Sequence, residues 1–136
     1  SRARVAIVTE AGIVPQGNPD GLESWRATKW VKYRIAGLDA LTPEEYTSVH
    51  GGFDTTQIRR DPHRIVPLDV LRDIEREGRI GHIHEDLYVT MGNVAPVARI
   101  AHMAAVNIGV AIISRSLFTG LKTAVADMKK LVNGAR

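Results

Sequence analysis

The first apolar stretch of the chain is short and unbroken. Residues 5–9 read VAIVT, with β-branched side chains and no polar position before the threonine. A strand that is covered on both faces shows this pattern, as happens in a parallel sheet. Similar runs follow at residues 87–90 and 110–113. We therefore predict strands over residues 5–8, 87–90 and 110–113.

Apolar residues at helical spacing predict two helices. In residues 67–77, PLDVLRDIERE, the side chains of Leu68, Leu71 and Ile74 share one face, and charged residues fill the other. Residues 117–132 carry a similar apolar stripe. The order of strands and helices predicts an α/β fold. We expect a three-layer sandwich with a small, mostly parallel sheet and a long ordered loop region after the first strand.

The segment between the first strand and the first long helix is rich in turn residues. Residues 12–23 read GIVPQGNPDGLE, and we expect neither a helix nor a strand to run through them. Further on, residues 42–45 read TPEE. Thr42 can cap a helix whose first residue is proline, and Glu45 can close a capping box. This pattern predicts a short helix that ends at the glycine pair of residues 51–52.

Aromatic and basic side chains alternate in residues 24–35, SWRATKWVKYRI. Trp25, Trp30 and Tyr33 all lie among arginines and lysines in this segment. Such a segment can stack on and neutralise an anionic ligand. It can equally be an edge or partner-facing segment whose rings pack while the cations stay in water. Both interpretations remain open at this point.

Composition excludes several classes of protein. A chain of 136 residues with 44% hydrophobic content can bury one core, so we expect a single domain over residues 1–136, as one half or one subunit of a larger assembly. The 18 Lys and Arg alternate with 15 Asp and Glu, which argues against nucleic-acid binding. The chain has no cysteine and therefore no thiol nucleophile. No run approaches the roughly 18 apolar residues of a membrane span, so we expect a cytoplasmic protein.

Candidate binding residues lie in the loops that follow the predicted strands. Ligands of open α/β sheets gather beyond the carboxyl ends of the strands. Glycines there let the backbone approach a small carboxylate or amino-acid-like substrate, and asparagine amides can orient it. The residues that we expect to bind such a substrate are Gly12, Gly17, Asn18, Asp20, Gly51, Gly52, Gly92 and Asn93.

Candidate catalytic residues lie in the segment HGGFD, residues 50–54. His50 can move a proton near neutral pH, and Asp54 can orient the imidazole, because a carboxylate beside a histidine fixes its tautomer. A loop histidine without any chemical role is the alternative. His82 and His84 would project to one side of a strand, but no third ligand stands at a recognisable spacing, so we predict no metal site.

Several phrases of the sequence resemble one known family. They are VAIVTEAGIVPQGNPD, GLDAL, HGGFD, DPHRIVPLDVLRDIEREGRIG and the turn over residues 88–93. The resemblance covers residues 4–93 and is to the C-terminal half of the selenoprotein B family, the substrate-handling subunits of glycine, sarcosine, betaine and D-proline reductases. It implies a selenocysteine at or near Leu117, acting on a substrate that a pyruvoyl group on a partner subunit holds as an imine. This chain lacks that selenocysteine motif.

Two hypotheses about function follow from the resemblance. In the first, the chain is a subunit of an oligomeric reductase-like complex that shapes the substrate pocket, while the redox or electrophilic group comes from another chain. In the second, it is a non-catalytic binding or scaffold subunit that kept the sheet and lost the nucleophile. We expect no cofactor in this chain. A minor variant makes Ser1 the source of a pyruvoyl group, against the more ordinary explanation of a cloning remnant.

Overall fold

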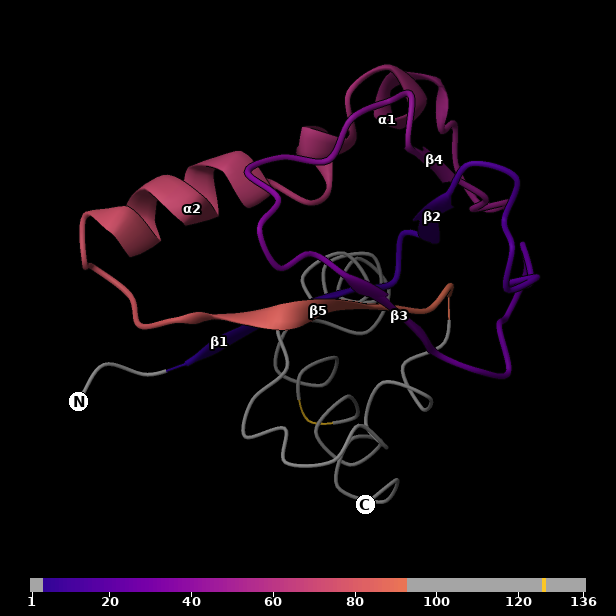
Figure 1. Ribbon diagram of the computed structural model, residues 1–136. Coiled ribbons are helices and arrows are strands. Elements are labelled where there is room, and N and C mark those ends of the chain that lie inside the picture. Colours follow the sequence, from indigo (N-terminus) through magenta and orange to yellow (C-terminus); the bar gives the residue numbers. More distant parts are fainter. Residues whose placement is uncertain (1–3, 93–125, 127–136) are drawn as a thin grey trace. The chain divides into compact units, whose positions relative to one another are not determined.

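The computed structural model describes residues 4–92 and 126 (Figure 1). The chain divides into two compact units, Ser1–Asn93 and Val94–Arg136, and all described residues except Ala126 belong to the first. The predicted strand over residues 110–113 and the predicted helix over residues 117–132 lie outside the described residues, as do Ser1 and Asn93. The single domain and the three-layer sandwich therefore stay predictions.

The main sheet is mixed. Strand β1 (Val5–Thr9) pairs in parallel with β5 (Ile83–Val89), which pairs antiparallel with β3 (Val31–Arg34), in the order β1-β5-β3 (Figure 1). The two predicted strands that are described pair in parallel, but a mostly parallel sheet is not confirmed, because the described sheet is mixed. The aromatic and basic segment supplies the antiparallel edge strand, because its side chains alternate between a buried Tyr33 and exposed cations at Lys32 and Arg34.

The two predicted strands of this sheet form with different boundaries and burial. Strand β5 begins four positions before residue 87, since Ile83, Leu87 and Val89 alternate with more exposed residues and all face the core. Strand β1 lies at the edge of the described sheet, and its side chains are half-buried or exposed rather than covered on both faces.

A second, two-stranded sheet crosses the segment in which we expected only loop. Strand β2 (Ile13–Pro15) pairs antiparallel with β4 (Tyr46–Ser48). Ile13 and Val14 are fully buried, so apolar burial overrides the turn signals on both sides of them. The prediction that no strand runs through residues 12–23 was therefore wrong.

The capping box at residues 42–45 does not start a helix. The Thr42 hydroxyl donates to the Glu45 carboxylate at 3.0 Å, and the backbone N–H of Tyr46 donates to the Thr42 carbonyl at 2.9 Å. The chain makes this one turn and then enters β4, where Tyr46 and Ser48 are buried. Tertiary packing of these two side chains outweighs the local helix signal.

The helices lie between β4 and β5 in the sequence. They are α1 (Thr56–Arg60), the short 3₁₀ helix η1 (Pro62–Arg64) and α2 (Leu68–Arg76). The prediction of α2 is confirmed to within one residue at each end. Arg72 of α2 donates to the carbonyls of Ile35 and Leu38 at 2.9 and 3.0 Å, which ties this helix to the segment after β3.

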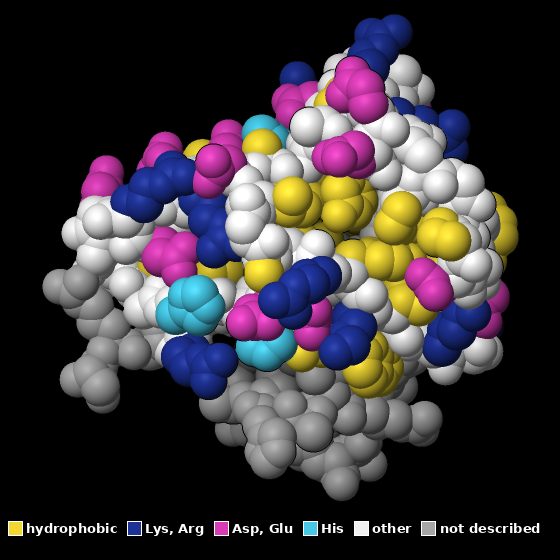
Figure 2. All heavy atoms as spheres, in the orientation of Figure 1, with side chains coloured by type: hydrophobic (Ala, Val, Ile, Leu, Met, Phe, Trp, Pro, Cys, Tyr) yellow, Lys and Arg dark blue, Asp and Glu magenta, His cyan; other side chains and the backbone are white. Residues whose placement is uncertain are grey.

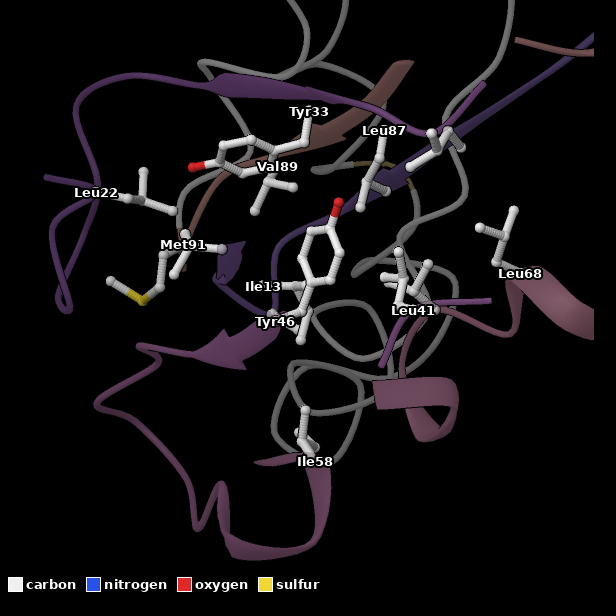
Figure 3. Packing of buried hydrophobic residues seen from close by; sticks show 14 of the residues in the cluster. Ile13, Leu22, Tyr33, Leu41, Tyr46, Ile58, Leu68, Leu87, Val89 and Met91 are labelled. Atoms are coloured by element: carbon white, nitrogen blue, oxygen red, sulfur yellow. The ribbon is translucent and has the colours of Figure 1, made fainter. Parts of the chain in front are cut away.

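One core joins the two sheets and α2. Figure 3 shows Tyr46 of β4 between Ile13 of β2 and Leu87 of β5. Figure 2 shows hydrophobic side chains over β2 and β3 on one face, while acidic and basic side chains intermix over α2. The largest fully buried side chains of the described unit are Ile13, Leu22, Ile35, Leu41, Leu68, Ile83, Leu87 and Met91. No helix among the described residues is long and apolar enough to cross a membrane.

Candidate functional site

The loops that follow β1 and β5 lie side by side. Ala11 and Met91 form an isolated antiparallel bridge, and the N–H of Gly12 donates to the Thr90 carbonyl at 3.1 Å. These positions come directly after two parallel strands, whose carboxyl ends share one edge of the sheet. The structure thus brings the predicted site residues Gly12 and Gly92 to the same edge.

Ser48 of β4 fastens the loop that carries His50 onto this edge. The Ser48 hydroxyl is fully buried, donates to the Ala11 carbonyl at 2.8 Å and accepts from the His50 N–H at 3.2 Å. The Val49 N–H donates to the Gly12 carbonyl at 2.9 Å. Gly12 has a φ of +61°, and a Cβ there would lie 3.3 Å from the His50 nitrogen. This close approach therefore requires glycine at position 12.

His50 is held as a neutral imidazole. The N–H of Gly52 donates to His50 Nδ1 at 2.9 Å, so Nδ1 carries no proton and the neutral ring has its hydrogen on Nε2. Burial lowers the pKa of His50 from its ordinary value of 6.5. The ring packs against Phe53, with 4.1 Å between the ring centroids. At neutral pH, His50 can donate a hydrogen bond from Nε2 and hold or move a proton there.

Asp54 is bonded to the start of α1. Its Oδ1 accepts from the Thr56 N–H at 2.9 Å and from the Thr56 hydroxyl at 2.6 Å, and these bonds lower the pKa of Asp54. No hydrogen bond joins Asp54 to His50 within the part of the chain that the structure describes. The orienting contact for the His50 ring comes from the Gly52 backbone instead.

Trp25 explains the glycine at position 51. The Gly51 N–H donates to the Ser24 carbonyl at 2.9 Å, and a Cβ on Gly51 would lie 2.5 Å from Trp25 Cε2. A Cβ on Gly52 would lie 2.8 Å from His50 Cε1. Both glycines therefore allow close packing of the loop. Their N–H groups are already bonded within the protein, as is that of Gly12.

The remaining predicted binding residues lie in a turn beyond β2. The Asn18 amide accepts from the Leu22 N–H at 2.9 Å and donates to the Leu22 carbonyl at 3.0 Å. Gly17 has a φ of +81° and open space around it. Burial raises the pKa of Tyr33, and the nearby Asp20 carboxylate raises it further. None of the hydrogen bonds found in residues 4–92 joins this turn directly to His50, Gly12 or Gly92.

The segments around Gly12, His50 and Gly92 form one loop cluster at the sheet edge. Sequence reasoning missed two charged residues beside it. Glu10 directly follows β1, and burial raises its pKa above the usual 4.5. Arg26 has a φ of +46°, and its backbone nitrogen lies 3.9 Å from where a Cβ on Gly92 would stand. The strand-end position of Glu10 could have identified it from the sequence. Nothing in the sequence distinguished Arg26 from the other cations of its segment.

The two histidines considered as a metal pair have other contacts. His82 Nδ1 lies 3.0 Å from the Glu75 carboxylate, and His84 Nδ1 accepts from the Asp86 N–H at 3.1 Å. Across residues 4–92, no group of three or more histidine, cysteine, aspartate or glutamate side chains could hold a metal ion.

The observed architecture is a small α/β domain with a loop cluster around one neutral histidine at the strand ends. The chain belongs to the glycine/sarcosine/betaine reductase selenoprotein B family, whose model matches residues 1–119. This membership agrees with the resemblance carried by the GNPD and HGGFD phrases.

Relatives of this family share about half of the aligned residues. The glycine reductase complex component B subunit gamma of Peptoclostridium acidaminophilum is 51% identical over 98 residues, 72% of this chain and 22% of that protein. The betaine reductase complex component B subunit beta of the same organism is 46% identical over 104 residues, 76% of this chain and 24% of that protein.

A shorter similarity points to another kind of protein. Pyridoxine 5'-phosphate synthase of Blochmanniella pennsylvanica is 52% identical over 44 residues, 32% of this chain and 18% of that protein. No solved structure matches the chain. The chain spans about a quarter of the length of the reductase subunits that it matches.

Proposed function

We propose that this chain is part of a subunit of a glycine/betaine/D-proline reductase-like complex in the cytoplasm. Its loops around Gly12, His50 and Gly92 shape the pocket for a small amino-acid-like substrate, together with the loop of residues 17–20. The redox or electrophilic group comes from another chain, because this one has no cysteine. The names of the relatives, component B subunits of glycine, sarcosine and betaine reductase complexes, support this role.

The observation that carries the proposal is the neutral His50 at the strand ends. Its Nε2–H can donate to a substrate oxygen or nitrogen, and Gly92 lies beside Gly12 at the same edge of the sheet. Gly12, Gly51 and Gly52 act by allowing close packing rather than by donating their amides to the ligand. Asn93 remains in the proposed site as the next residue after Gly92.

The role of Asp54 distinguishes a catalytic subunit from a non-catalytic binding or scaffold subunit. If Asp54 moves protons together with His50, the loop must rearrange to release the carboxylate from Thr56. If Asp54 only holds Thr56 at the start of α1, His50 is the one ionisable side chain of the HGGFD segment left for substrate. The second case favours a non-catalytic binding or scaffold subunit as the alternative function.

Variants of the assembled complex test this proposal. His50→Gln should abolish turnover while leaving thermal unfolding almost unchanged, with His82→Gln as a histidine control outside the cluster. Asp54→Asn keeps an oxygen that can accept from Thr56 and removes the charge, so it abolishes turnover only if the charged carboxylate takes part in the reaction. Full activity of both the His50 and the Asp54 variants would refute the proposed pocket. Intact mass of the chain would show whether Ser1 carries a pyruvoyl group.

A further inference from the structure

Arg26 has an unusual backbone conformation for its residue type. Two residues other than glycine have a positive φ in the described part of the chain, Asn18 at 49° and Arg26 at 46°. The left-handed region costs roughly 1–2 kcal/mol for most L-residues, and asparagine is among the few that visit it readily. Asn18 is also compensated locally, since its side chain bonds both backbone groups of Leu22. Arg26 has no such compensation.

The neighbours of Arg26 hold it in this conformation beside the loop cluster. The Ala27 N–H donates to the Met91 carbonyl at 3.0 Å, and the Ser24 carbonyl accepts from the Gly51 N–H at 2.9 Å. Arg26 therefore lies between the segment that carries His50 and the segment that carries Gly92. Strained residues of this kind persist where the surrounding structure fixes them, and they gather at binding sites.

The guanidinium of Arg26 has no partner among the described residues. It is exposed, and neither a hydrogen bond nor an ion pair engages it there. Most other arginines of this unit are engaged: Arg34 pairs with Glu85 at 2.8 Å, and Arg59 donates to the Ser48 carbonyl at 3.3 Å. Arg4 and Arg60 are also without a partner among the described residues. Unlike Arg26, they do not lie between the segments of His50 and Gly92 in the chain's contacts: Arg4 precedes β1, and Arg60 ends α1.

We propose that Arg26 binds the carboxylate of the small amino-acid substrate. This inference rests on the proposed function and names the group that the pocket recognises. A guanidinium offers two parallel N–H donors that match the two oxygens of a carboxylate. Its neighbours place the Arg26 backbone next to Gly92 and next to the loop whose His50 carries a hydrogen on Nε2.

Matched ligands and variants test this role in the assembled complex. The probes are betaine and glycine, compared with choline and ethanolamine, which replace the carboxylate by a hydroxymethyl group. Arg26→Gln should raise the dissociation constants for betaine and glycine on the order of tenfold or more and leave those of choline and ethanolamine unchanged. Arg60→Gln, the control, should change none of them. Arg26→Lys should retain part of the affinity, because it keeps the charge without the fork.

A second variant separates binding from folding. Arg26→Gly should lose carboxylate binding as Arg26→Gln does, while its thermal stability stays equal or rises, because glycine adopts a positive φ without strain. Unchanged affinity of Arg26→Gln for betaine and glycine, with binding abolished in His50→Gln, would overturn the role of Arg26 and leave the proposed function standing. If the unaltered complex bound neither betaine nor glycine, both proposals would fall.

Discussion

Ser48→Ala is the sharpest test of how the site is built. This change removes one oxygen atom from a fully buried side chain. The Ala11 carbonyl then loses its 2.8 Å bond and the His50 N–H its 3.2 Å bond. Both groups belong to the loop cluster. The change should therefore weaken the contact between the Gly12 and His50 segments and lower the free energy of unfolding.

The expected loss follows from the unsatisfied groups. A buried polar group left without its hydrogen bond costs about 1–3 kcal/mol, and the His50 N–H, which is less buried, adds less than the Ala11 carbonyl. We expect a total of about 2 kcal/mol. With a urea m-value of about 1–1.5 kcal/mol/M for a unit of this size, the midpoint should fall by more than about 1 M.

Tryptophan fluorescence can follow this unfolding specifically. The chain has two tryptophans, and both lie in residues 24–35 of the described unit. Ser24→Ala is the matched control, because it removes the same atom from an exposed residue whose hydroxyl makes no hydrogen bond among the described residues. Midpoints of Ser48→Ala and Ser24→Ala that agreed within error would refute the idea that Ser48 fastens the two loops.

Two further substitutions and one titration probe single features of the cluster. Gly51→Ala should destabilise by about 1–3 kcal/mol and shift the Trp25 emission, since its Cβ would lie 2.5 Å from that ring; an unshifted spectrum would contradict this. Glu10→Gln should stabilise the chain at pH 7 and lose this advantage near pH 4, because burial raises the pKa of Glu10 and penalises only its charged form; equal stability of both proteins at pH 7 would refute it. By NMR, His50 should titrate below its ordinary 6.5, so its contribution to stability is present above that value and weakens as the pH falls below it. A titration at or above 6.5 would exclude the buried neutral ring.

Strong local patterns were readable from the sequence. The α2 helix has an apolar face, a proline before its first turn and Gly78 after its end, and all these signals agree. The β1 and β5 strands were found for the same reason. Where the signals conflicted, tertiary burial decided the structure. The buried Ile13 and Val14 form a strand between turn residues. The buried Tyr46 begins β4 directly after the capping box, so no helix follows it.

The site was partly predictable for a different reason. Loops after parallel strands meet at one edge, which identified Gly12 and Gly92 without any contact information. No rule of spacing could show that the Asn18 amide closes on Leu22 or that the Asp54 carboxylate closes on Thr56. These are short-range bonds of a polar side chain with its own backbone, and they compete with any ligand.

The same bonds sort the residues of the loops into two groups. Asn18 and Asp54 have bonds with the neighbouring residues Leu22 and Thr56, and Gly51 has its steric reason in Trp25, so the fold alone accounts for these residue types. The fold does not account for Arg26, whose guanidinium has no partner among the described residues and whose backbone has a positive φ. Within the same part of the chain, nothing accepts from His50 Nε2, although the Gly52 N–H fixes that tautomer. Since a ligand needs donors that the described fold leaves free, these two side chains are the ones that the proposed substrate site uses.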